Sequence, residues 1–191
     1  MIYFIRHGET DWNVQGRLQG QRDIPLNAQG QTQGIAVSQK LKEAAGSVHV
    51  LDYVASPLER TRHTMETVRC ELGLPPDGYR VDERLKEIHF GEWEGLTWAE
   101  IREKDPERLS LRDKDRWNFD PPRGGENYHM LCDRVMSFVN EIKRDTVMVS
   151  HGGVARALLV ALCGASPQKA PIEDIFQGQL LVFRNGNSLW I

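Results

Sequence analysis

Short apolar segments alternate with longer amphipathic ones along this chain. Three apolar runs are rich in β-branched and aromatic residues, which is typical of strands buried on both faces: 2–5, 50–55 and 146–150. Each run ends in a polar turn, and apolar residues at helical spacing then predict helices over 28–45, from residue 57, and over 154–163. Repeated strand, turn and helix units predict an α/β fold, a three-layer α/β/α sandwich with a largely parallel central sheet. In such sheets ligands bind at the carboxyl ends of the strands.

The segment 97–125 departs from this alternation, because its apolar residues stand among many charged ones before Pro121-Pro122. We interpret it as a small helical excursion from the sheet that can roof the crevice. Its charge-dense run 112–116 is typical of a solvated helix face. Three tryptophans in or near the segment could line a pocket: Trp93, Trp98 and Trp117. We expect at least two of them in the core, since aromatic side chains bury large areas.

The last residues of the chain predict a β-hairpin. Residues 180–184 and 188–191 are rich in apolar side chains, and Asn185-Gly186-Asn187 between them is typical of a tight turn. The final strand offers an edge through which a homodimer could form.

Length and composition indicate a single domain, residues 1–191. The 191 residues, 40% of them hydrophobic, suffice for one sizeable core. With 24 basic and 27 acidic side chains the formal charge is -3, so no nucleic-acid partner is expected. Cys70, Cys132 and Cys163 are odd in number and widely spaced, which favours buried reduced thiols over disulfides. The sequence shows neither a secretory signal nor an apolar run long enough for a membrane span, so we expect a cytoplasmic protein without membrane contact.

Candidate chemistry lies directly after the first predicted strand. Arg6-His7-Gly8, followed by Asn13 and Arg17, places an imidazole and two guanidinium groups beside a glycine. Arginine binds phosphate oxygens in a bidentate way, and glycine permits tight turns that expose backbone N–H groups to an anion. An isolated Arg-His-Gly is more often a packing or capping feature, so the interpretation depends on the rest of the chain.

The other two predicted strands end in similar units. The helix after Ser56-Pro57 carries Arg60 in its first turn, where the helix dipole favours anions and disfavours a cation. An ordinary helix start explains the serine and the proline but not the arginine. Ser150-His151-Gly152-Gly153 then places a second histidine between a strand and a helix. Together the units indicate a phosphoryl-binding site at one edge of the sheet.

These residues resemble the histidine phosphatase superfamily, also called the phosphoglycerate mutase-like family, over nearly the whole chain. The matching motifs occur in family order: Arg6 to Thr10 with Asn13; Gly16 to Gly20 with Asp23, Pro25 and Leu26; Ser56 to Leu58 with Arg60, Thr61 and Thr64; Glu83, Leu85 and Glu87 with Gly91 and Gly95; Gly124 to Glu126; and Ser150 to Gly153.

The resemblance implies a role for each of the motif residues. His7 is the nucleophile that forms a phosphohistidine, and Glu87 is the proton donor. The transferred phosphoryl group is bound by Arg6, Asn13, Arg60 and His151, and the substrate site also includes Gln19, Gly20 and Gly152. These roles agree with general chemistry, since imidazole attacks only when neutral and nearby guanidinium groups disfavour its protonation. No metal ion or other cofactor is expected, because positive side chains supply the electrostatic stabilisation.

The residues around Glu87 bear on the reaction. By spacing alone Glu87 fits a solvated position in the mixed-charge run 82–87 better than a catalytic one, and only the family resemblance makes it the proton donor. Glu83 in the same run is a structural candidate. After Glu87 the family's mutases usually carry Arg-His-Tyr-Gly, whereas this chain has Ile88-His89-Phe90-Gly91, the pattern of the phosphatase branch. A mutase must also hold further anionic groups of its substrate and exclude water, but the insertion here is short.

We therefore expect a metal-independent phosphomonoesterase that acts on a small phosphorylated metabolite. Phosphoglycerate mutase activity is the alternative. A catalytically silent family member that binds phosphorylated partners is a third hypothesis, weakened because every catalytic position is filled.

Overall fold

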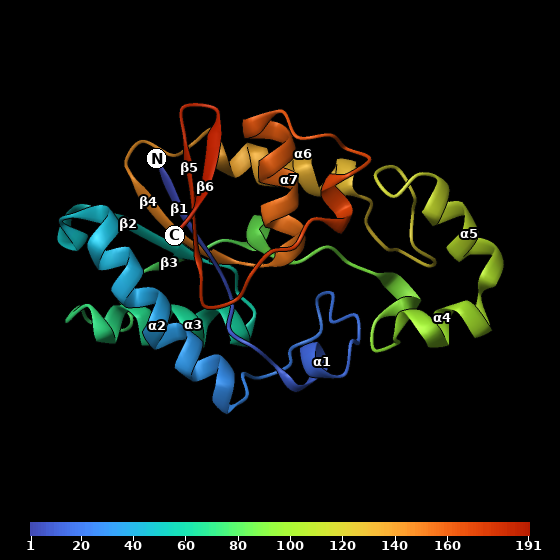
Figure 1. The fold of residues 1–191 in the computed structure, drawn as a ribbon, viewed down its shortest axis with the longest axis horizontal. Helices are drawn as coiled ribbons and strands as arrows, with labels where there is room; N and C mark the ends of the chain where they lie inside the picture. Colours follow the sequence, from blue (N-terminus) through green and yellow to red (C-terminus); the bar gives the residue numbers. More distant parts are fainter.

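The computed structural model describes residues 1–191, and β1 (Ile2–Arg6) lies near the middle of its six-stranded sheet (Figure 1). The strands follow the order β3-β2-β4-β1-β5-β6. Their bounds are Asp52–Ala55 for β2, Arg80–Val81 for β3, Thr146–Ser150 for β4, Leu180–Arg184 for β5 and Asn187–Trp190 for β6. The first four strands run parallel, and the β5–β6 hairpin adds two antiparallel strands. The largely parallel sheet and the terminal hairpin predicted from the sequence are confirmed.

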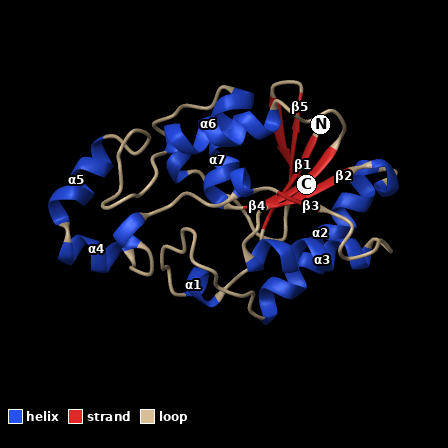
Figure 2. Cartoon of the chain, turned by 180° about the vertical axis from the view of Figure 1, so that it is seen from behind, coloured by secondary structure: helices blue, strands red, loops and turns tan.

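Two pairs of helices cover the two faces of the sheet (Figures 1 and 2). One pair is α2 (Ala28–Ala45) with α3 (Glu59–Glu71), and the other is α6 (Tyr128–Val139) with α7 (Gly152–Cys163). Successive side chains of a strand point to opposite faces, and β1 follows this rule. Tyr3 and Ile5 pack in the core beneath α2 and α3, whereas Ile2 and Phe4 pack in the core beneath α6 and α7. The three-layer sandwich follows from strands that are apolar on both faces.

Some boundaries differ from the predicted ones. Helix α3, predicted from residue 57, begins at Glu59 because Leu58 is still extended. The Glu59 N–H donates to Asp23 Oδ1 at 2.6 Å. The last helix begins at Gly152, two residues earlier than predicted. Strand β2 begins at Asp52, since Val48–Val50 form a 3-10 turn.

The segment 97–125 is a helical excursion, as predicted, that lies to one side of the sheet (Figures 1 and 2). It contains α4 (Trp98–Lys104) and α5 (Pro106–Lys114), preceded by a 3-10 turn at Gly91–Trp93. Its small core of Trp93, Ile101 and Leu109 is separate from the two cores of the sheet. Backbone hydrogen bonds join it to the loop after α1 (Asp11–Val14), from Leu18 N to Leu96 O and from Gly95 N to Leu18 O.

The cysteines correct one prediction. None forms a disulfide, but Cys70 is exposed on α3 and the other two are half-buried, so fully buried thiols are wrong. Helical spacing places Cys70 outside the stripe of α3 that packs on the sheet.

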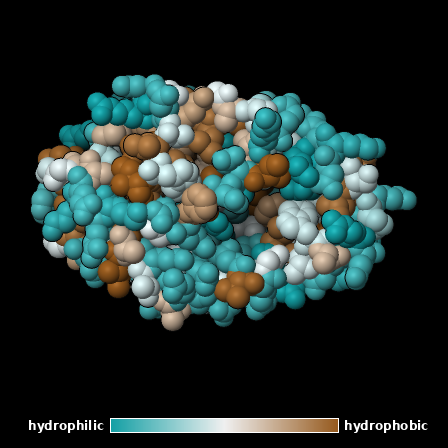
Figure 3. Space-filling model, viewed as in Figure 1, coloured by the Kyte–Doolittle hydropathy of each residue, from teal (hydrophilic) through white to brown (hydrophobic).

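None of the helices combines the length and the apolar character that crossing a bilayer requires. The face drawn in Figure 3 is mostly hydrophilic, and its hydrophobic side chains gather in small separate groups.

Candidate active site

The carboxyl ends of β1, β2 and β4 bring the predicted motifs together. In the parallel register Arg6 lies opposite Ser150, and Ala55 lies opposite Val149. Backbone hydrogen bonds extend this pairing one residue past the strands, because His7 N donates to Ser150 O at 2.9 Å and Ser56 N donates to Val149 O at 3.0 Å. The rings of His7 and His151 consequently lie with their centroids 5.2 Å apart.

The tautomer of His7 is fixed by its backbone neighbour. Its Nδ1 lies 2.7 Å from Gly8 O, and a carbonyl oxygen can only accept a hydrogen bond. Nδ1 therefore carries the proton, and Nε2 keeps its lone pair. Burial, followed by the charges of Arg60 and Arg6, holds the pKa of His7 well below the ordinary value of 6.5, and the side chain is only 2% exposed. His7 is thus a neutral imidazole with a free nucleophilic nitrogen.

His151 is equally buried, and its environment also keeps it neutral. Its Nε2 lies 2.8 Å from Ser56 Oγ, whereas its buried Nδ1 has no hydrogen-bond partner in the protein. Burial is the main cause that lowers the pKa of His151 well below 6.5, and the charge of Arg60 adds to it.

The two buried histidines predict a pH-dependent stability. In the unfolded chain each histidine binds a proton below about pH 6.5, but the folded protein holds both neutral, so protonation favours unfolding. The free energy of unfolding should fall as pH drops from about 7 to about 5.5, by up to about 1.4 kcal/mol per pH unit for each histidine. Urea unfolding of wild type and His7→Ala measures this, and the variant should lose one histidine's share of the slope. Equal slopes for wild type and His7→Ala would contradict the assignment.

Two arginines flank the histidines with charges that no carboxylate pairs. Arg60 is fully buried, and its Nη1 and Nη2 donate to the carbonyls of Arg22 and Gly20 at 2.7 and 2.8 Å. Arg6 Nη1 donates to Ile175 O at 2.7 Å. Burial lowers the pKa of both guanidinium groups to about 10, which still leaves them charged at neutral pH.

Three of the five buried side-chain polar atoms without a hydrogen-bond partner belong to these arginines and to His151. The buried side-chain atoms without one are Arg6 Nε, Gln19 Oε1, Arg60 Nε, Arg116 Nε and His151 Nδ1. Buried polar groups in native proteins are nearly always hydrogen-bonded, so unpartnered ones mark functional candidates. A phosphoryl group offers several acceptor oxygens and a negative charge, which match the two guanidinium groups.

Glu87 lies beside the turn that follows β4. Its Oε1 accepts hydrogen bonds from Gly153 N at 3.0 Å and from Ile88 N at 2.9 Å. A Cβ atom at Gly153 would overlap Glu87 Oε1, so a larger residue there would displace this carboxylate. Arg134 fixes the loop by donating to the Glu87 carbonyl and by a bidentate pair with Glu126. Glu83, in contrast, is exposed and pairs with Lys86.

The other residues predicted to contact the substrate are Asn13, Gln19, Gly20 and Gly152, and they lie near the catalytic histidines and arginines. Asn13 Oδ1 accepts from Thr10 and from Gln177, which leaves Asn13 Nδ2 available to a ligand. Gln19 is buried next to Gly20, whose carbonyl holds Arg60, and a Cβ at Gly152 would lie 3.8 Å from Arg6 Nε.

Gln177 is a site residue that sequence analysis missed. Its Nε2 donates to His7 O and to Asn13 Oδ1, both at 3.1 Å, from a loop 170 residues further along the chain than His7. No strand end, helix start or glycine-rich turn marks this position in the sequence, so no signal pointed to it.

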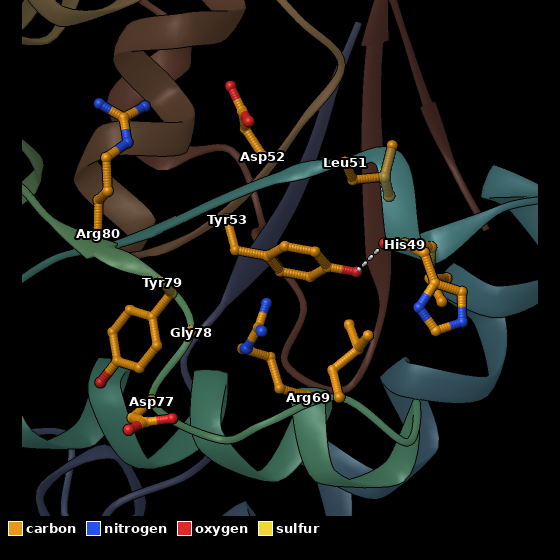
Figure 4. A pocket seen from close by; sticks show the side chains of 11 residues that line it. His49, Leu51, Asp52, Tyr53, Arg69, Asp77, Gly78, Tyr79 and Arg80 are labelled. Atoms are coloured by element: carbon orange, nitrogen blue, oxygen red, sulfur yellow. Dashed lines mark hydrogen bonds between the residues drawn. The ribbon is translucent and has the colours of Figure 1, made fainter.

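A hollow of about 480 Å³ lies away from these residues, at the edge of the sheet near β2 and β3 (Figure 4). Its main polar groups are already engaged. The Tyr53 hydroxyl donates to Val48 O at 2.9 Å, Arg69 Nε donates to Pro75 O at 2.7 Å, and Tyr79 donates to Glu66. The Arg69 guanidinium also lies 4.5 Å from the centre of the Tyr53 ring. These mutual contacts favour a structural role for this hollow.

The fold and the two-histidine site define the class of protein. The chain belongs to the histidine phosphatase superfamily (branch 1), whose sequence profile matches residues 2–188. A metal-independent phosphoserine phosphatase of Arabidopsis thaliana is 35% identical over 170 residues, 86% of this chain and 69% of that protein. A glucosyl-3-phosphoglycerate phosphatase of Mycobacterium tuberculosis is 36% identical over 175 residues, 84% of this chain and 74% of that protein. The solved structure of the alpha-ribazole phosphatase from Shigella flexneri superposes with a TM-score of 0.80 at 27% identity, covering 98% of this chain and 92% of that one.

Proposed function

We propose that the protein is a metal-independent phosphomonoesterase that acts on small phosphorylated metabolites through a phosphohistidine at His7. The observation that carries the proposal is the geometry of His7, a neutral imidazole whose Nε2 lone pair is free beside two charged arginines. An uncharged imidazole is nucleophilic, and fixed positive groups stabilise the transferring phosphoryl group.

The reaction has two steps. First, His7 Nε2 attacks the phosphorus atom while the ester P–O bond breaks, and Glu87 gives its proton to the leaving oxygen. Arg6, Arg60, His151 and Asn13 bind the phosphoryl oxygens during this transfer. Next, a water molecule attacks the phosphohistidine, the N–P bond breaks, and the Glu87 carboxylate takes a proton from the water. The products are the alcohol and inorganic phosphate, and both side chains return to their starting states.

Two features support a phosphatase over a mutase. The named relatives include phosphatases for phosphoserine and for glucosyl-3-phosphoglycerate, both small phosphate esters. The excursion that holds α4 and α5 is short, which leaves water access to the intermediate. The test is a comparison of phosphate release from a panel of phosphomonoesters with conversion of 3-phosphoglycerate to 2-phosphoglycerate. Rapid isomerisation without phosphate release would favour the mutase instead.

Activity should survive exhaustive chelation and should be inhibited by vanadate. Arginine and histidine side chains surround the site, and no three His, Cys, Asp or Glu side chains gather where they could hold a metal ion. Vanadate adopts the trigonal bipyramidal geometry of the transferring phosphoryl group, which the same positive groups should bind. Phosphate release measured with EDTA and with a vanadate series checks this. Loss of activity in EDTA that added magnesium restores would overturn the proposal.

The cytoplasmic location and the homodimer stay predictions. Strand β6 is an edge of the sheet and exposes Leu189, so sedimentation of wild type and Leu189→Lys would test the dimer.

A further inference from the structure

A cavity of about 500 Å³ lies between the helical excursion and α7. Four arginines line it, Arg102, Arg112, Arg116 and Arg156, and Asp113 is its one acidic residue. They come from α4, from α5 and the residues just after it, and from α7, so tertiary folding gathers them.

The cavity lies next to the catalytic residues. Arg156 follows Gly152 by about one turn of α7, and a Cβ at Gly152 would lie 3.4 Å from Arg156 Nη1 and 3.8 Å from Arg6 Nε. Tyr128 lines the cavity wall, and the charges of Arg156 and Glu87 both act on its buried hydroxyl. A leaving group attached to the phosphoryl group at His7 would therefore extend toward these arginines.

The positive charges of the cavity exceed the negative ones. Arg116 Nη2 and Arg112 Nη1 share one carboxylate, at 2.9 and 3.5 Å from Asp113 Oδ1. Arg156 Nε donates only to a neutral carbonyl, that of Glu173, at 2.9 Å. Arg102 has no acidic partner within ion-pair distance, and Arg116 Nε is buried without a partner.

One of these guanidinium groups, that of Arg112, is also held in place before any ligand arrives. The Arg112 side chain is half-buried, and its guanidinium carbon lies 4.1 Å from the centre of the Trp98 ring. Burial lowers the pKa of Arg112, and the like charges of Arg116 and Arg156 lower it further. The run 112–116 is therefore not simply a solvated helix face, which corrects the sequence-based expectation. Arg112, Arg116 and Arg156 are partly buried, whereas Arg102 is exposed. Like charges gathered in a partly buried place repel one another, and an anion between them removes that repulsion.

We propose that this cavity binds a second anionic group, carried on the leaving group of the substrate. The substrate class is then a phosphomonoester that also bears a carboxylate or a second phosphate. This inference rests on the proposed phosphatase function, and it narrows the range of esters hydrolysed at His7.

Matched ester pairs test the inference on the wild-type protein. 3-Phosphoglycerate and glycerol 3-phosphate differ in a carboxylate against a hydroxymethyl group, and propane-1,3-diol bisphosphate and 3-hydroxypropyl phosphate differ in the second phosphate. A charge-assisted contact with arginine predicts kcat/KM roughly 10- to 100-fold higher for the doubly anionic member of at least one pair. The pair with the larger ratio identifies the anionic group. Equal rates within both pairs would overturn the inference while leaving the phosphatase function intact.

Variants assign the preference to the cavity. Arg116 lies just after α5 and Arg156 lies on α7, and Arg116→Gln and Arg156→Gln should each reduce the ratio within the preferred pair about tenfold or more. Arg108→Gln removes an exposed arginine of α5 outside the cavity and should keep the wild-type ratio. An unchanged ratio in both cavity variants, with thermal unfolding like that of wild type, would show that the preference arises elsewhere and would overturn the assignment.

Binding to the His7→Ala protein separates this inference from the reaction. Calorimetric titration with each member of the preferred pair measures affinity without turnover. The doubly anionic ester should bind about tenfold or more tightly than its partner. Equal affinities would overturn the inference even if wild type hydrolyses both esters. A clear preference without hydrolysis by wild type would instead overturn the proposed function and leave the anion-binding cavity.

Discussion

His7→Ala is expected to lose turnover by a factor on the order of 10⁴ or more and to form no phosphoenzyme. The substitution removes the His7 Nε2, which keeps a free lone pair because Nδ1 of His7 is engaged by Gly8 O. His151 cannot replace it, because its Nε2 is occupied by Ser56 at 2.8 Å and its remaining nitrogen serves the phosphoryl oxygens in the proposed reaction. Rapid-quench labelling with a radiolabelled phosphate ester measures both the burst of phosphoenzyme and the steady-state rate.

The matched control is His63→Ala, because His63 lies half-exposed on α3 and pairs only with Glu59. It should keep both the burst and the rate. Circular dichroism and thermal unfolding show whether His7→Ala is folded. An acid-labile, base-stable phosphoenzyme that still forms in folded His7→Ala would show that another imidazole is the nucleophile.

The sheet and its flanking helices could be predicted because their causes are local in the sequence. The apolar runs that become β1 and β4 bury both faces, and they end at Arg6 and Ser150, where polar side chains begin. The helix over 28–45 agrees in both bounds with α2, since its Asn27 cap and its Gly46 terminus are adjacent in the chain. Where the residues that begin and end an element are adjacent to it in the chain, the sequence pattern alone predicts the bounds of that element.

The parts that could not be predicted depend on residues distant in the chain. The first N–H of α3, that of Glu59, donates to a carboxylate of Asp23, 36 residues earlier in the chain. Gln177 reaches His7 from the loop before β5. Arg112 and Arg156 look like ordinary charged helix positions until the excursion folds against α7. The catalytic motifs were recognisable from the chain, whereas the cavity beside them is a product of tertiary packing.

Glu87→Gln is expected to reduce the rate of histidine phosphorylation about 10²- to 10⁴-fold for esters with poor alkoxide leaving groups, the usual contribution of general acid catalysis. Glutamine is nearly isosteric, and its amide oxygen can still accept from Gly153 N and Ile88 N, so the loop should keep its position. What it lacks is the proton that an alkoxide oxygen takes as the P–O bond breaks. Single-turnover burst rates for glycerol 3-phosphate measure that loss.

Comparison of leaving groups separates this acid role from damage to the pocket. Nitrophenolate departs without a proton, so the phosphorylation rate with nitrophenyl phosphate should fall far less in Glu87→Gln than the rate with glycerol 3-phosphate. Only the phosphorylation step is compared, since Glu87 also accepts the proton of water during hydrolysis of the phosphohistidine and the variant slows that step for every substrate. Glu83→Gln is the matched control, because Glu83 is exposed, pairs with Lys86 and belongs to the same run, and it should leave both rates unchanged. Equal losses on the two esters in Glu87→Gln would mean that the carboxyl positions the phosphoryl group and that another group protonates the leaving oxygen.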